Sequence, residues 1–171
     1  LERAVDYYLV QDLGEAMRDL DAAISAAPDS WILYFVRSSV RYRLLETEQL
    51  NADIAGDGLM PKHAEGLPDI NFRLVKDDLD RVVALVPDFP HAYFNRANTS
   101  AKLSDFKSAI VDYTKAIELN DRFAEAYFNR GLARIYTGNT EGGIPDLSKA
   151  GELGLFHAYS LIKRFKMSGG R

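Results

Sequence analysis

The side chains that most often carry out chemistry in proteins are sparse in this sequence. Its three histidines, His63, His91 and His157, form no His-x-x-x-His or Glu-x-x-His pair, the spacings that place two metal ligands on one face of a helix. There is no cysteine, which excludes thiolate zinc sites, disulfides and a cysteine nucleophile. The segment Asp53-Ile-Ala-Gly-Asp57-Gly is partly similar to a calcium loop, but it lacks the third-position ligand and the closing glutamate. We therefore expect no metal and no cofactor.

Motifs for catalysis, nucleic-acid binding and membrane insertion are equally missing. The sequence contains neither a glycine-rich phosphate loop with lysine nor a Gly-x-Ser-x-Gly elbow. A net charge of −4 gives no basic surface for nucleic acid. No apolar run approaches the roughly 20 residues that cross a bilayer. The sequence therefore predicts a protein that is not an enzyme, with no nucleic-acid partner and no membrane span. It shows no targeting segment, so the cytoplasm is the default location.

A repeat of 34 residues organises the chain. Residues 90–123 aligned with 124–157 give eleven identities, including the block Ala-Tyr-Phe-Asn-Arg that begins at Ala92 and at Ala126. Upstream, repeat two spans 31–89 and holds about 25 extra residues near 45–69, while repeat one, 1–30, is incomplete at its N-terminus. The sequence thus predicts four units in one domain over 1–171, with a final helix at about 158–167.

The pattern within this period resembles the tetratricopeptide repeat, a helix–turn–helix unit of 34 residues. Aromatic and small residues recur at its expected positions in repeats three and four: Tyr93, Ala97, Ala109, Tyr113 and Ala116, then Tyr127, Gly131, Gly143, Leu147 and Ala150. The resemblance implies an all-α, right-handed α-solenoid of four repeats with a capping helix. It also implies a scaffold for protein–protein interaction.

Residues with N-cap side chains stand where the second helix of each repeat should begin. They are Asp12, Asn71, Asp105 and Asn139. A side-chain oxygen at this position accepts a hydrogen bond from a free backbone N–H of the first turn. We therefore expect all four to start helices.

Arginine and aspartate recur at fixed offsets on helices that should face each other. Every repeat has an aspartate in its second helix, and repeats two to four have an arginine in the first: Arg37 with Asp78, Arg96 with Asp112, and Arg130 with Asp146. We predict three ion pairs inside the stack. The alternative is a ladder of arginines that binds anionic ligands.

The resemblance implies a concave face, lined by first helices, that binds a peptide. The candidate residues are Phe35, Tyr42 and Arg43 in repeat two, Phe94, Asn95, Asn98 and Lys102 in repeat three, and Phe128, Asn129, Leu132 and Tyr136 in repeat four. Exposed phenylalanines at one shared repeat position would hold apolar side chains of the peptide. The two equivalent asparagines, Asn95 and Asn129, would hydrogen-bond its backbone, and Arg43 and Lys102 would favour acidic flanks. Alternatively, the phenylalanines belong to the core.

The insertion should lengthen the first helix of repeat two. Apolar spacing predicts a helix from Trp31 past Leu45 toward Ala55, followed by an irregular segment from Gly56 to Pro68. This segment is either a lid, with Leu59 and Met60 against the groove or the repeat edge, or a tolerated insertion.

Repeat four contains helix-breaking residues in its second helix. Gly142, Gly143 and Pro145 follow Asn139 closely, and an interior proline removes a backbone hydrogen bond. We therefore expect this helix to be kinked or to start late.

The leading functional hypothesis is a non-catalytic module that binds a peptide or protein segment in the concave groove. The alternative is a module for self-association, as a homo-oligomer, or for docking within a larger chain.

Overall fold

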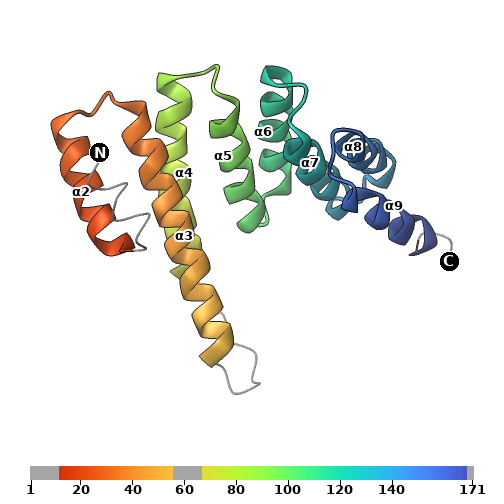
Figure 1. Cartoon of the computed structure of the whole chain (residues 1–171), viewed down its shortest axis with the longest axis horizontal. Helices are drawn as coiled ribbons and strands as arrows, with labels where there is room; N and C mark the ends of the chain where they lie inside the picture. The colour runs from red at the N-terminus through yellow and green to blue at the C-terminus, as the bar shows by residue number, and fades with distance from the viewer. Residues whose placement is uncertain (1–11, 56–66, 169–171) are drawn as a thin grey trace. The chain divides into compact units, whose positions relative to one another are not determined.

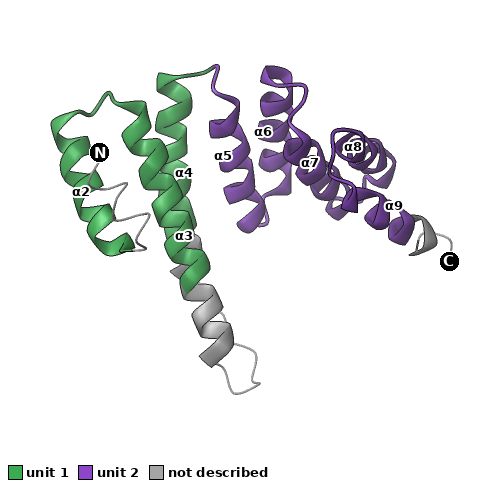
Figure 2. Ribbon diagram, in the orientation of Figure 1, with its two compact units in different colours: residues 1–87 green, residues 88–171 purple. Residues whose placement is uncertain are grey.

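The computed structural model describes residues 12–55 and 67–168, and these ranges contain eight helices and no strand. The chain divides into two compact units, residues 1–87 (unit 1) and 88–171 (unit 2), coloured separately in Figure 2. Unit 1 contains α2 (Leu13–Ala26), α3 (Trp31–Ala55) and α4 (Leu67–Leu85). Unit 2 contains α5 (Pro90–Lys102), α6 (Phe106–Leu119), α7 (Ala124–Tyr136), α8 (Thr140–Glu152) and α9 (His157–Ser168) (Figure 1).

In unit 1, α3 packs against α2 on one side and α4 on the other. Leu20 of α2 and Val40 of α3 are fully buried in a core that continues through Leu13, Ile24 and Leu33. The α3 helix has 25 residues, against 13 in α5 and in α7. The expected continuation of this helix to Ala55 is confirmed.

In unit 2, each helix packs against the next one along the chain. Tyr113 of α6 fills the space among Ala97, Ala109 and Ala133, all of which are buried. Small residues at these positions let the helices approach closely, as their spacing in the sequence predicted.

Three of the four predicted N-caps are confirmed. Asp12, Asp105 and Asn139 each accept a hydrogen bond from a backbone N–H three residues later, at 3.2, 3.1 and 2.8 Å. The prediction for Asn71 is wrong, because α4 already begins at Leu67 and Asn71 lies inside it. Pro68 falls in the first turn of α4, where its missing N–H is not needed.

The early start of α4 also corrects the predicted irregular segment, since Leu67 and Pro68 are helical. The rest of that segment, including Leu59, Met60 and the predicted lid, lies outside the described residues. His63 and most of the first helix of repeat one also lie outside them.

The prediction of a late start for the second helix of repeat four is wrong. The α8 helix begins at Thr140, directly after its cap Asn139, and includes Pro145. The Asn139 cap, together with the backbone bond from Gly143 N–H to its carbonyl oxygen, forms the first turn before the proline is reached.

The α9 helix covers the range expected for the terminal helix. Ala158 is buried against α8, and Leu161 and Ile162 are half-buried beside it. Ser160 and Arg164 are exposed to solvent. A polar outer face of this kind is typical of a terminal helix that closes a repeat array.

The closest approach of α7 and α8 requires glycine on both helices. A Cβ atom built at Gly143 would lie 2.6 Å from the carbonyl oxygen of Gly131 and 2.6 Å from Cγ1 of Ile135. We expect Gly143→Ala to lower the free energy of unfolding by about 1–3 kcal/mol, because overpacking outweighs the gain in helix propensity. Urea unfolding followed by circular dichroism measures this change.

Gly14 of α2 provides the matched control, because a Cβ there would meet only Asp12, at 3.9 Å. Gly14→Ala should leave stability unchanged or raise it by up to about 1 kcal/mol. Equal effects of the two substitutions would contradict the packing argument.

Candidate functional site

All three predicted Arg–Asp pairs are confirmed. The guanidinium of Arg96 donates two hydrogen bonds of 2.7 Å to the carboxylate of Asp112. Arg130 donates two of 2.8 Å to Asp146. Arg37 contacts both carboxylate oxygens of Asp78, with Nε at 3.2 and 3.1 Å. Each pair joins the two helices of one helix–turn–helix unit.

A tyrosine one turn earlier on the first helix stacks beneath each of these arginines. The guanidinium carbon lies 5.6 Å from the ring centre in Arg37–Tyr34 and 5.5 Å in both Arg96–Tyr93 and Arg130–Tyr127. Such contacts add cation–π attraction to the ion pair. The repeating element is therefore a Tyr–Arg–Asp triad.

Two of the three aspartates bind a second arginine, one turn further along the first helix. Arg41 donates to Asp78 at 2.6 Å and Arg134 to Asp146 at 2.8 Å. Each also donates to a backbone carbonyl of the facing helix, that of Leu74 or of Gly142. The equivalent residue beside Asp112 is Ser100, whose buried hydroxyl has no hydrogen-bond partner among the described residues.

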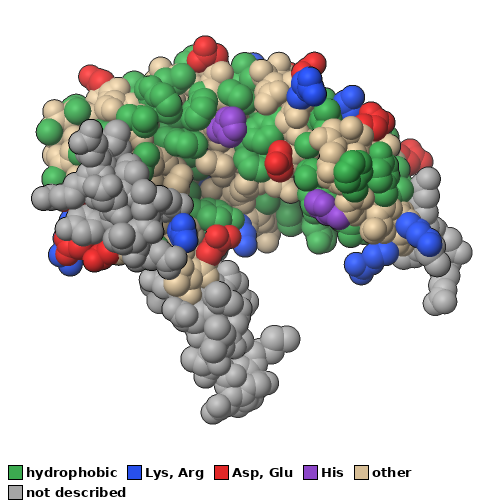
Figure 3. All heavy atoms as spheres, viewed as in Figure 1, with side chains coloured by type: hydrophobic (Ala, Val, Ile, Leu, Met, Phe, Trp, Pro, Cys, Tyr) green, Lys and Arg blue, Asp and Glu red, His purple; other side chains and the backbone are tan. Residues whose placement is uncertain are grey.

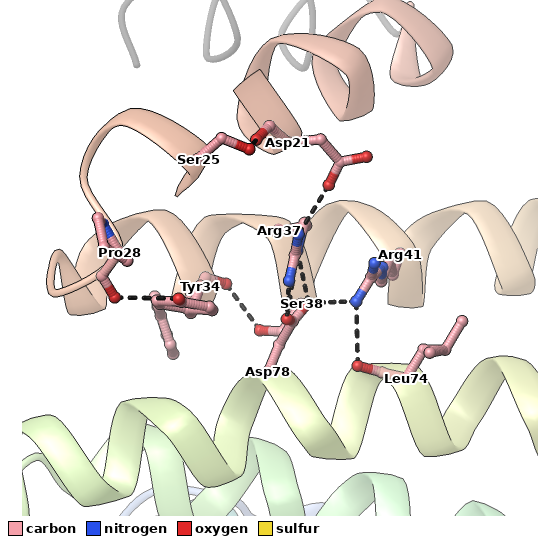
Figure 4. Close-up of polar contacts among 10 residues, drawn as sticks. Asp21, Ser25, Pro28, Tyr34, Arg37, Ser38, Arg41, Leu74 and Asp78 are labelled. Atoms are coloured by element: carbon pink, nitrogen blue, oxygen red, sulfur yellow. Dashed lines mark hydrogen bonds and ion pairs between the residues drawn. The ribbon is translucent and has the colours of Figure 1, made fainter. Parts of the chain in front are cut away.

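Arg37 and Arg130 also reach back to the preceding helix. Figure 4 shows Arg37 between Asp21 of α2 and Asp78 of α4, with a 2.7 Å bond to Asp21. Arg130 donates to the hydroxyl of Thr114 in α6 at 3.1 Å. These bonds engage both guanidinium groups in contacts between helices, which favours the structural interpretation over an anion-binding ladder.

The pKa of Arg37 reflects these contacts. Burial alone would lower the pKa, but the hydrogen bonds and charges of Asp78 and Asp21 outweigh it and the pKa is raised. Arg37 is therefore held in its charged form.

The predicted groove residues divide between the two units. Phe35, Tyr42 and Arg43 lie on α3 of unit 1, and the other eight lie on α5 and α7 of unit 2. In unit 1, Tyr42 packs edge-on against Phe72, with ring centres 5.7 Å apart. Burial, with a smaller contribution from Glu46, raises the pKa of Tyr42 to about 12.

Each phenylalanine of the predicted row is half-buried and contacts another aromatic ring. Phe94 lies 5.9 Å from Tyr113 and 4.6 Å from Phe123, measured between ring centres. Phe128 contacts the ring of His157 at 4.7 Å, and Phe35 that of Trp31 at 6.4 Å. Phe123 and His157 occupy the last position of repeats three and four, so one packing pattern recurs in unit 2.

Two asparagines of the predicted set meet in unit 2. The side-chain oxygen of Asn98 on α5 accepts hydrogen bonds from the hydroxyl of Tyr113 at 2.7 Å and from the amide of Asn129 on α7 at 2.9 Å. This contact joins the first helices of successive helix pairs. The sequence placed both asparagines on the concave face, but it did not predict their bond or the role of Tyr113.

The remaining residues of the unit 2 set differ in exposure. Lys102 is exposed at the end of α5, and Asn95 is half-buried on the same helix. Tyr136 is 70% exposed and its ring stacks on Phe106 of α6 at 5.4 Å. Leu132 is half-buried and packs in the cluster that joins α7, α8 and α9.

The sequence analysis did not place α9 in the groove, although the same period extends to it. Counting 34 residues from Asn129 gives Lys163, which is exposed on α9. The repeat spacing was the signal that would have added Lys163 to the candidate set. Figure 3 shows one face of the molecule, on which hydrophobic side chains surround a histidine near the start of α5.

Neither a metal cluster nor a bilayer-crossing helix is found in the described ranges. Within residues 12–55 and 67–168, no three His, Asp or Glu side chains converge as metal ligands would. Over the same ranges, every helix is too short or too polar to pass through a membrane.

Comparison with known proteins identifies the repeat. The family model described as "Tetratricopeptide repeat" matches residues 90–123. Residues 90–123 are a tetratricopeptide repeat. This match covers the predicted third repeat, which contains Phe94, Asn98 and the Arg96–Asp112 pair. Among the curated proteins, none matches the chain.

Solved structures share the fold at low sequence identity. "Crystal structure of MamA" is 18% identical, with a TM-score of 0.75, and covers 95% of this chain and 84% of that one. "MamA 41-end from Desulfovibrio magneticus RS-1" is 14% identical, with a TM-score of 0.70 and coverages of 89% and 72%. "First TPR of Spaghetti (RPAP3) bound to HSP90 peptide SRMEEVD" is 24% identical, with a TM-score of 0.56 and coverages of 58% and 81%. The predicted fold class, an all-α solenoid of tetratricopeptide type, is confirmed.

Proposed function

We propose that this chain is a non-catalytic protein-interaction module. Unit 2 binds an extended segment of a partner protein across the first helices α5, α7 and α9. Support for this class of function comes from the tetratricopeptide repeat at 90–123 and from the similar RPAP3 repeat, which is bound to an HSP90 peptide. The boundaries of the other repeats belong to the same proposal.

The Asn98–Asn129 pair is the observation that carries the proposal. The bond between the two amides uses the oxygen of Asn98 and one N–H of Asn129. Among the described residues, the amide nitrogen of Asn98 and the oxygen of Asn129 have no hydrogen-bond partner. An extended backbone offers one carbonyl and one N–H per residue, so this pair matches it with one donor and one acceptor.

Exposed lysines on either side of this pair indicate the charge of the ligand. Lys102 ends α5, and Lys163 lies on α9, while Glu125 is the exposed acid on α7. Two cations against one anion favour a segment with acidic residues. Tyr136 and the half-buried ring of Phe128 provide apolar surface for its side chains.

An affinity measurement on Asn129→Ala tests the proposal. The probe is the strongest binder that a displayed random-peptide library yields against the full chain. We expect the dissociation constant to rise about two- to tenfold, because one hydrogen bond to the ligand backbone is lost. The free energy of unfolding should fall by less than about 1 kcal/mol, since Asn129 is only half-buried.

Asn95→Ala is the matched control, because Asn95 has the same side chain at the equivalent position of α5 and lies outside the Asn98–Asn129 pair. Affinity should change less for Asn95→Ala than for Asn129→Ala. A library that yields no binder, or a selected peptide that binds Asn129→Ala as tightly as the original chain, would contradict the proposal.

A further inference from the structure

The lengthened helices of unit 1 leave a hollow between them. It is lined by Arg41, Leu44, Leu45, Asn71 and Leu74, and its volume is about 140 Å³. In unit 2, a short turn such as Leu103–Asp105 closes the helix pair at the equivalent level. In unit 1, α3 and α4 both continue past it, so three leucines line a recess at their seam, and Leu74 is 42% exposed.

The hollow is apolar in its lining and lies in an acidic part of the chain. The guanidinium of Arg41 is already bound to Asp78 and to the carbonyl of Leu74, so it presents little free charge. Residues 44–61 contain four acidic residues and no basic one. A fitting ligand therefore has an apolar group flanked by positive charge.

The C-terminal end of the chain has this chemistry. Phe156, which precedes α9, is 73% exposed, the highest exposure among the large hydrophobic side chains of the described residues. Arg164 on α9 is also exposed. Residues 153–171 contain four of the chain's 21 lysines and arginines and none of its 25 acidic residues. The two regions are thus opposite in charge.

We propose that the hollow of unit 1 receives Phe156 of a second copy of this chain. A cavity of about 150 Å³ lined by apolar side chains binds benzene, so about 140 Å³ suits a phenyl ring. The basic C-terminal segment of one copy then lies against the acidic extension of the other. This contact uses neither Asn98 nor Asn129, so it is independent of the proposed peptide groove.

Sedimentation of the full chain over a range of concentrations tests this association. We expect the average mass to rise above 19.2 kDa with concentration and to fall back as salt screens the charges. Phe156→Ser and Leu74→Glu should each weaken association by about tenfold or more. Both side chains are exposed, so the melting temperature of each variant should stay close to that of the original chain.

Mixing the two variants gives the sharpest result. Phe156→Ser keeps its hollow and Leu74→Glu keeps its phenylalanine, so the mixture should form a one-to-one dimer that neither variant forms alone. Val111→Ser, which alters a side chain 67% exposed on α6, should associate like the original chain. A chain that stays monomeric at every concentration, or a mixture that does not associate, would overturn the proposal.

Discussion

Replacing Asp146 with alanine is expected to lower the free energy of unfolding by about 3–5 kcal/mol. The carboxylate of Asp146 is buried and accepts hydrogen bonds from Arg130 and Arg134. Its removal leaves two guanidinium groups without their anion, and both are partly shielded from water. Urea unfolding followed by circular dichroism measures the loss.

Asp112→Ala is the matched comparison, because Ser100 stands where the second arginine stands in the α7–α8 pair. We expect a loss at the lower end of the same range. A smaller loss for Asp146→Ala than for Asp112→Ala would show that the second arginine adds nothing. A loss below about 1 kcal/mol in both variants would contradict a stabilising role for the pairs.

Replacing Phe94 with alanine is expected to cost about 3 kcal/mol of folding stability, the lower end of the range for buried phenylalanines. Phe94 is half-buried, but its ring packs on Tyr113 and Phe123, which are both buried. Thermal and urea unfolding measure this loss.

Tyr136→Ala is the control for Phe94, because Tyr136 is 70% exposed on α7. We expect it to change stability by less than about 0.5 kcal/mol and to weaken binding of the selected peptide. If Phe94→Ala instead left the melting temperature unchanged and abolished binding, the ring would belong to the ligand surface and not to the core.

Features that depend on one repeat or on a fixed offset were predictable from the sequence. Asp105 and Asn139 cap helices because their side chains accept a hydrogen bond from the first turn that follows them. Arg96 and Arg130 meet their aspartates because the offset of 16 residues places both on facing helices. The period alone contains this information.

Asn71 shows where local preference fails. It has a favoured cap side chain, but the insertion supplies Leu67 to Ile70 ahead of it, and these residues extend the helix backwards. An N-cap preference of about 1 kcal/mol is small beside the packing of an added helical turn.

The candidate site was predictable in part. The spacing placed Asn98 and Asn129 on first helices, but their bond depends on the distance between α5 and α7, which is set by Tyr113 and its small neighbours. The second arginines, Arg41 and Arg134, escaped notice because the equivalent residue of repeat three is Ser100, which breaks the pattern.

The reach of Arg130 back to Thr114 has a thermodynamic consequence for unit 2. One side chain contributes both to the stability of its own helix pair, through Asp146, and to the interface with the preceding pair, through α6. In a linear array, the ratio of such interface energies to intrinsic energies sets the cooperativity of melting. Arg130 thus acts as a nearest-neighbour coupling, so that loss of order in the α7–α8 pair weakens α6 at the same time.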